Sequence, residues 1–298
     1  MGYWEAWLLV GLDRIVYTRL LNQDICGEHD AIVHYLTQAW TVAHQYGPQI
    51  EQIARDEMRH LKWLSHSVVA LGGIPDLTTP VMRSATSMRD AMEQDIQAEI
   101  DAIQQYEDHM ATISDSKIQH LLARIVIDEK DHYRQFTEWL DQQQGEPWGD
   151  QHPGEDVANV AVQLETLVGI EYQAVLTHLM ESFIKHHQRH VGMDEEDRAV
   201  DEMRHLGWVA EQLAHIGVVP PLGRLFLGHG LNPLESDEAR ELERYRAVRR
   251  WATDTHPEIL PLLDRIVAHE DYQNSLRSEK DGWTVGPLRD EYRGLGGT

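Results

Sequence analysis

The sequence DEMRHLKWLSHSVVALGGIPD, residues 56–76, returns as DEMRHLGWVAEQLAHIGVVPP at residues 201–221. Each copy opens on the same five residues, DEMRH, and closes on Gly followed by Pro. A match of this length between distant parts of one chain indicates a duplicated unit of about half the chain. The sequence therefore predicts two domains, residues 1–145 and 156–298, joined by a linker at 146–155 that is rich in Gly, Pro and acidic residues.

Helical periodicity runs through both halves, and no segment alternates as a strand does. Clusters of Gly and Pro interrupt the periodicity and mark the helix ends. The predicted helices are 13–45, 49–71, 86–112 and 116–143 in the first half, and 156–188, 194–216, 235–254 and 257–280 in the second. Four helices per half predict an all-α fold of two tandem four-helix bundles, with residues 71–88 as a crossover between the second and third helices.

The composition is strongly acidic, with 50 Asp and Glu against 26 Lys and Arg and a net charge of −24. Such a charge predicts that neither nucleic acid nor an anionic membrane is a partner. The single cysteine, Cys26, excludes a disulfide framework, a four-cysteine metal site and a thiolate-held iron–sulfur cluster within this chain. The apolar stretch 4–12 is too short to span a bilayer and lacks a preceding basic region, so we expect a packing segment and a soluble, cytoplasmic protein.

Two Glu-x-x-His pairs and two further glutamates form an ordered set in the first half. Each pair places a carboxylate and an imidazole one turn apart on a helix, and each further glutamate lies on an apolar stripe. A lone Glu-x-x-His is usually a solvated pair, but a carboxylate on an apolar stripe is costly to bury without a partner. Along the four predicted helices, a single glutamate alternates with a Glu-x-x-His pair. This pattern predicts a carboxylate-bridged centre of two metal ions. The predicted ligands are Glu28, Glu57, His60, Glu99, Glu129 and His132.

The first half resembles the bacterioferritin and rubrerythrin branch of the ferritin-like superfamily over about residues 18–140. The segments that carry the resemblance are LLNQDICGEHDAIVHYL, DEMRHLKWL, ALGGIPDL, AEIDAIQQY and DEKDHYRQF. The resemblance implies a ferritin-like bundle in which these ligands hold two irons, or iron and manganese, with Glu57 and Glu129 bridging. It also implies that Tyr35 lies near the metals and takes part in the reaction. Rubredoxin-type cysteines are missing, which puts rubrerythrin-like electron transfer within this chain in doubt.

The second half carries an incomplete copy of the ligand set. Aligning GIEYQAVLTHL with CGEHDAIVHYL, and DRIVAHEDYQ with ARIVIDEKDH, gives the equivalent positions. The predicted second set is Glu171, Glu202, His205, Glu241 and Glu270, with Glu243 as the alternative to Glu241 and Gln273 in place of the second histidine. Because an amide is a weak ligand for iron, this site binds one metal, binds two loosely or serves as scaffold.

Met58 and Met203 each follow the glutamate of the DEMRH motif. In bacterioferritins, a methionine near this position from each of two subunits ligates a haem. If the two halves pack as an internal pseudo-dimer, both methionines could meet in the same way. Glu-Met-x-His also occurs in ferritin-like proteins without haem, so the haem stays an open alternative.

Together these features predict a non-haem di-iron protein that oxidises Fe(II) with O2 or H2O2, in the manner of a ferroxidase or peroxidase. One alternative is a di-iron oxygenase or oxidase that acts on a small organic substrate, which requires an apolar channel beside the site. Another is a non-catalytic partner in an iron-storage assembly. The sequence leaves three points open: whether the metal is iron or manganese, what donates the electrons, and whether the protein is a monomer, a homo-oligomer or a cage.

Overall fold

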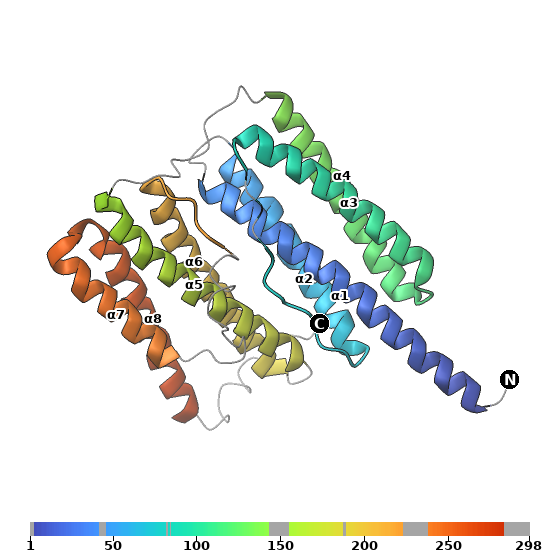
Figure 1. The fold of residues 1–298 in the computed structure, drawn as a ribbon. Helices are drawn as coiled ribbons and strands as arrows, with labels where there is room; N and C mark the ends of the chain where they lie inside the picture. Colours follow the sequence, from blue (N-terminus) through green and yellow to red (C-terminus); the bar gives the residue numbers. More distant parts are fainter. Residues whose placement is uncertain are drawn as a thin grey trace, which may run out of the picture. The chain divides into compact units, whose positions relative to one another are not determined.

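The computed structural model describes residues 3–41, 46–81, 83, 85–142, 155–186, 189–222 and 238–282. Regular secondary structure in these ranges is helical, which confirms the predicted all-α class (Figure 1). The elements are α1 (Tyr3–Thr41), α2 (Gly47–Ala70), α3 (Met88–Thr112), α4 (Ser116–Gln142), α5 (Glu155–Ile184), α6 (Arg189–His215), α7 (Glu238–Thr255), the 3-10 helix η2 (Pro257–Ile259) and α8 (Leu260–Gly282).

The chain has two compact units, Met1–Ser236 and Asp237–Thr298. The first contains α1 to α6, and the second contains α7, η2 and α8. The boundaries predicted from the duplication stay a prediction, and residues 146–154 of the predicted linker lie outside the described residues. None of the described helices carries an apolar run long enough to cross a bilayer.

Helix α1 begins at Tyr3, ten residues earlier than the predicted start at residue 13. The predicted start was wrong, because no residue between Tyr3 and Asp13 breaks a helix. No proline lies between Tyr3 and Asp13, and Gly11 costs only about 1 kcal/mol relative to Ala in a helix. The contacts of side chains 3–11 lie outside the description, so the packing role of this stretch stays a prediction.

Helices α1 to α4 form the first bundle. Helix α1 packs along α2 and against α3, and α4 packs along α3 and against α2 (Figure 1). Apolar side chains on the inward face of every helix are fully buried, including Leu21, Ile25, Ile50, Leu64, Met92, Leu122 and Phe136. The predicted crossover joins α2 to α3 and is held to α1, where Asn22 donates to the carbonyl of Ile74 and accepts from the amide of Asp76.

Helices α2 and α6 end in the same way at equivalent glycines. Gly72 and Gly217 have φ angles of 86° and 84°, in the left-handed region. The amide of Gly72 donates to Val69 and that of Gly73 to Val68, and the amides of Gly217 and Val218 repeat both bonds after α6. These two bonds define the Schellman motif, in which glycine relieves the strain of the left-handed residue. The glycine that stands three residues before a proline in each copy, Gly72 or Gly217, therefore forms the same helix cap twice.

Helices α5 and α6 pack on the first bundle through a crosswise pairing. Helix α1 contacts α6, and α2 contacts α5. A two-fold axis that carries α1 onto α5 and α2 onto α6 turns a contact of α1 with α6 into a contact of α5 with α2. The two observed contacts are therefore the pair that such an axis relates. Gly207 of α6 lies beside the indole of Trp40 of α1, which a Cβ there would meet at 3.5 Å, an ordinary van der Waals distance. Within the first unit, α1–α2 and α5–α6 thus meet as in an isologous dimer.

The second unit is a helical hairpin. Helix α7 packs against α8, and η2 forms the turn between them. Its core is apolar and consists of Leu242, Tyr245, Val248, Ala252, Ile259, Leu263 and Ile266. This pair matches the third and fourth helices that the sequence predicts for the second half, and the second four-helix bundle itself stays a prediction.

We predict that Gly72→Ala and Gly217→Ala each lower the free energy of unfolding by about 1–3 kcal/mol, because alanine is strained at positive φ. Asparagine tolerates this region better, so Gly72→Asn loses less. Gly27→Ala is the matched control, since Gly27 is helical and a Cβ there meets only Gln105 Nε2 at 4.0 Å. Urea titration followed by circular dichroism measures all four. Alanine at residue 72 without loss would contradict the cap.

Candidate metal centre

The first bundle brings all six predicted ligands together at its centre. Each helix supplies its share from an inward face, and every one of the six side chains is buried. Their ligand atoms form two overlapping groups, each within 4.8 Å: Glu28, Glu57, His60 and Glu129, and Glu57, Glu99, Glu129 and His132. Glu57 and Glu129 belong to both groups, as bridging ligands must. The structure thus forms two adjacent sites that share two carboxylates.

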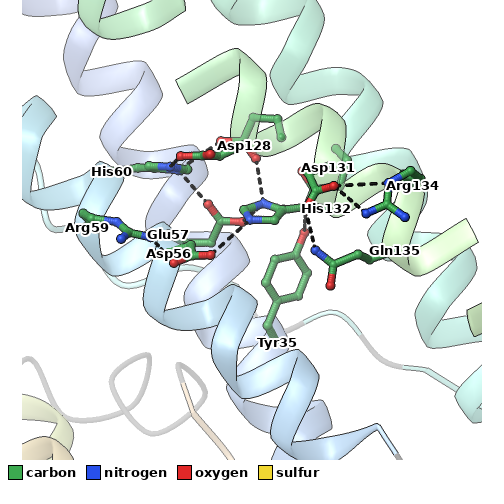
Figure 2. Close-up of polar contacts among 12 residues, drawn as sticks. Tyr35, Asp56, Glu57, Arg59, His60, Asp128, Asp131, His132, Arg134 and Gln135 are labelled. Carbon is green, nitrogen blue, oxygen red and sulfur yellow. Dashed lines mark hydrogen bonds and ion pairs between the residues drawn. The ribbon is translucent and has the colours of Figure 1, made fainter. Parts of the chain in front are cut away.

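Each imidazole faces several carboxylates with one nitrogen. His60 Nδ1 lies 2.9 Å from Glu57, 3.1 Å from Glu129 and 3.5 Å from Glu28. His132 Nδ1 lies 3.0 Å from Glu57 (Figure 2) and, like His60, also faces Glu129, at 3.3 Å. One N–H can donate a good hydrogen bond to only one of these oxygens. Oxygen Oε1 of Glu57 and of Glu129 is buried without a well-formed hydrogen bond, so the donor set fits a cation at each nitrogen.

Charge in the centre is unbalanced without a cation. Burial raises the pKa of Glu28 well above its usual range, and the charges of Glu129 and Glu57 raise it further. Burial also lowers the pKa of His132, but the carboxylates of Glu57 and Glu129 outweigh it and raise that pKa to about 10. Burial opposes ionisation of Glu129, yet hydrogen bonds from His132 and His60 lower its pKa to about 2. Without metal ions, protons on Glu28 and His132 thus offset the negative charge that metal ions would otherwise offset.

Two aspartates that were not predicted orient the histidines. His60 Nε2 lies 3.2 Å from Asp128, and His132 Nε2 lies 3.7 Å from Asp56. The pairing is crosswise, because each aspartate comes from the helix of the opposite Glu-x-x-His pair. A carboxylate hydrogen-bonded to Nε2 keeps the proton there and leaves Nδ1 free to bind metal, as Asp128 does for His60, whereas Asp56 lies beyond hydrogen-bond distance of His132. The signal was in the sequence, since Asp precedes Glu in both pairs and the full motif is Asp-Glu-x-x-His.

Two tyrosines hold the outer glutamates from across the bundle. Tyr35 of α1 donates to Glu99 of α3, and Tyr106 of α3 donates to Glu28 of α1. Both rings are buried, and burial raises the pKa of both phenols well above the usual range, so the hydroxyl protons stay in place. Tyr35 was predicted near the metals, whereas Tyr106 was not. Each tyrosine stands seven residues after a ligand glutamate, a spacing that identifies the second.

A second pair of crosswise networks lies one turn before the outer glutamates. In each, a buried aspartate on one of the helices α1 and α3 is bound by a histidine and a glutamine of the other. The networks are Asp24 with His109 (2.8 Å) and Gln105 (2.9 Å), and Asp95 with His34 (3.2 Å) and Gln38 (2.7 Å). These bonds fix the register of α1 against α3, and hence the positions of both outer ligands.

The second half brings together three of its predicted ligands. Glu171 of α5 and Glu202 and His205 of α6 form a buried group within 4.8 Å. His205 Nδ1 lies 3.1 Å from Glu202 and 3.6 Å from Glu171, much as His60 lies from its two glutamates. These residues reproduce the part of the first centre that α1 and α2 supply.

The remaining predicted ligands of the second half lie on α7 and α8. Glu270 and Gln273 are buried, and Glu241 is partly exposed. Glu243, the alternative to Glu241, is exposed and forms an ion pair with Arg250 at 2.8 Å. Membership of Glu241 and Glu270 in a second centre stays a prediction.

The two methionines line common cavities. Met58 and Met203 both border a cavity of about 320 Å³ and a neighbouring one of about 420 Å³. Most residues around them come from α1, α2, α5 and α6, the four helices of the crosswise pairing, and Leu77 and Leu222 complete the lining. The methionines thus lie where a shared ligand would need them, and the haem stays a prediction.

A family model, Ferritin-like domain, matches residues 18–145. Residues 18–145 are a ferritin-like domain. Among solved structures, bacterioferritin of Desulfovibrio desulfuricans is similar at 21% identity and a TM-score of 0.43, over 44% of this chain and 82% of that one. Mycobacterium tuberculosis bacterioferritin BfrA is similar at 24% identity and a TM-score of 0.40, over 42% and 84%. A search of curated proteins finds no match. The centre described above lies wholly inside the ferritin-like domain.

We predict that Asp128→Ala lowers the affinity for one metal ion about 10- to 100-fold, because His60 loses the partner that fixes its tautomer. Asp131→Ala is the matched control, since Asp131 is exposed on the same helix and contacts only Arg134 and Gln135 among the residues of Figure 2. Anaerobic Fe(II) titration by calorimetry compares the variants. Equal loss in both, or none in Asp128→Ala, would contradict the role given to this residue.

Proposed function

We propose that the ferritin-like domain binds two irons and oxidises Fe(II) with O2 or H2O2. The observation that carries the proposal is the pair of overlapping ligand groups that share Glu57 and Glu129. Two carboxylates common to both groups can hold two cations a few Å apart and offset their repulsion. Oxygen and nitrogen donors suit iron and manganese, and we place iron first because the family model is that of a ferritin-like domain.

The chain's own residues have distinct parts in this reaction. Glu28 with His60, and Glu99 with His132, would each hold one ion, while Glu57 and Glu129 hold both. Bound Fe(II) would supply the two electrons that, with two protons, convert H2O2 into two molecules of water. Tyr35 and Tyr106 keep the outer glutamates in place, because each donates its hydroxyl proton to one of them. The protein thus preorganises negative charge where the charge on iron increases.

Burial limits side reactions at the centre. The six ligands are each no more than 4% exposed, so the protein shields them from bulk water except at the cavity that borders Glu28, Glu57, Glu99 and Glu129. Low exposure strengthens every charge interaction there and protects an oxidised centre from stray reductants. A cytoplasmic location and a homo-oligomer stay predictions from the sequence.

A second candidate is an oxidase or oxygenase that acts on a small organic substrate. It is favoured by a cavity of about 150 Å³ that borders Glu28, Glu57, Glu99 and Glu129. The sequence could not reveal such a cavity. Oxygen consumption with Fe(II) alone separates the two candidates, because an oxygenase consumes little oxygen beyond its first turnover without an organic substrate.

We predict that Glu57→Ala removes both irons of the ferritin-like domain and abolishes Fe(II) oxidation, because Glu57 belongs to both ligand groups. The experiment is anaerobic Fe(II) loading, desalting and metal analysis, followed by stopped-flow mixing with O2 or H2O2. Glu51→Ala is the control on the same helix, where Glu51 only pairs with Arg55 at the surface. Wild-type protein without specific iron, or full oxidation in Glu57→Ala, would contradict the proposed function.

A separate prediction concerns the second half. We expect one further, weaker ion at Glu171, Glu202 and His205, because three buried ligands without a second imidazole suffice for one ion but not for two. His205→Ala should remove this ion alone, and Glu57→Ala should leave it. Iron counted per chain in the two single variants and the double variant decides the matter. A count unaffected by His205→Ala would make α5 and α6 a scaffold.

A further inference from the structure

Two histidine rings stack on each other where α2 packs against α5. The ring centroids of His66 on α2 and His186, which follows the end of α5, lie 4.1 Å apart, and the rings are tilted by 28°. Phe183 of α5 meets the ring of His66 edge to face, with 5.6 Å between centroids and an angle of 86°. The amide of His186 donates to the carbonyl of Phe183, which shapes the turn after α5. A pair of imidazoles thus joins the first half of the chain to the second.

The nitrogens of these two rings are available to a ligand. Within the part of the chain that the structure describes, no hydrogen bond engages a ring nitrogen of His66 or His186. Burial lowers the pKa of His66 to about 4, with smaller contributions from the charges of His186 and Lys62. The ring of His66 is therefore uncharged at neutral pH, and an uncharged imidazole is the form that binds metal ions.

The spacing of the rings determines which ion fits between them. An ion that bonds one nitrogen of each ring at about 2.0–2.1 Å leaves the two centroids about 4 Å apart only if the two bonds form roughly a right angle. The observed separation is 4.1 Å. Square-planar ions offer right angles between neighbouring ligands, whereas a tetrahedral ion needs a wider angle and would separate the rings. The pair therefore fits Cu2+ better than Zn2+.

The charges around the pair tolerate a cation. Glu196 of α6 is close enough to His66 to oppose the lowering of its pKa. The same carboxylate forms an ion pair with Lys62, which stands one turn before His66 on α2. Because the ammonium of Lys62 is compensated, an ion at the two rings does not face an unpaired positive charge.

The pair has no counterpart in the other copy of the repeat. Glu211 stands at the position of His66, and Ala43 stands at the position of His186. Neither of these residues has an imidazole, so the internal two-fold relation does not generate a second pair. An ion at this place is expected once per chain.

We propose that His66 and His186 bind one Cu2+ ion, which ties α2 to α5, with water in the remaining positions. Imidazole nitrogens suit copper, whereas the carboxylate-rich centre of the first bundle suits iron or manganese. His66 stands six residues after His60 on α2, about 9 Å further along the helix, so the two sites are separate. The inference goes beyond the proposed function and does not depend on it.

Copper binding is measured on the full chain by calorimetric titration with Cu2+. His66→Phe keeps a ring against Phe183 and His186 but has no nitrogen, so it separates metal binding from stacking. We expect it to bind one Cu2+ fewer than the wild type, or to bind that ion at least about tenfold more weakly. His186→Ala changes an exposed residue and should lose the same ion. His120→Phe, at an exposed histidine of α4, is the matched control and should bind as the wild type does.

Electron paramagnetic resonance identifies the ligands of the bound ion. The spectrum of the wild type minus that of His66→Phe should show copper coupled to two nitrogens. Zn2+ should compete for this site at least about tenfold more weakly than Cu2+ binds it. Zn2+ that binds as tightly as Cu2+ would overturn the right-angled geometry on which the inference rests.

Chemical modification locates the ion in the wild-type protein. Diethyl pyrocarbonate modifies accessible uncharged imidazoles, and mass spectrometry with fragmentation measures each histidine. Cu2+ should protect His66 and His186 and leave the modification of His120 unchanged. Equal protection of His120, or none of His186, would overturn the inference whether or not the variants fold. Protection of His186 that persists in His66→Phe would also overturn it, because copper would then bind without the pair.

Discussion

The structure depends on one constraint, which is that four buried carboxylates face only two imidazole nitrogens. His60 and His132 cannot satisfy Glu57, Glu129 and the outer glutamates at once, because each Nδ1 carries at most one proton. Such an arrangement is costly in a helical core unless cations complete it. The fold around it supplies what a metal centre needs and an apolar core does not: oriented donors, low exposure and fixed helix register.

The supporting contacts obey an approximate two-fold symmetry inside the first bundle. Asp56 and Asp128, Tyr35 and Tyr106, and the two buried aspartate networks all cross from one helix pair to the other. Because every contact has a counterpart, the two ions would have nearly equal surroundings. The asymmetry comes from outside the core, where Arg83 of the crossover pairs with Asp30 and has no counterpart on the other helix.

Sequence alone predicted the helices and the six side chains that the structure brings together, because both follow from the spacing within single helices. Asp56, Asp128 and Tyr106 escaped prediction because their partners lie on other helices, and only the repeated spacing hinted at them. The predicted start of α1 was wrong because the apolar stretch 4–12 was treated as a separate segment, although it contains no residue that ends a helix. The cavity beside the four glutamates could not be predicted, because its small lining residues come together only when α1 and α3 lie side by side. These residues are Gly27, Ala31, Ala98 and Ala102.

The second half shows which features depend on one another. At the position of Tyr35 it has His178, which binds Glu195 of α6 at 2.9 Å, and at the position of Asp24 it has the buried Leu167. At the position of His132 it has Gln273. The supporting residues have thus changed together with a ligand, as expected if their purpose is to serve two metal ions. The glycine cap of α6 is unchanged, and α5 and α6 still contact α2 and α1, so the copy has kept its helix ending and its packing on the first bundle.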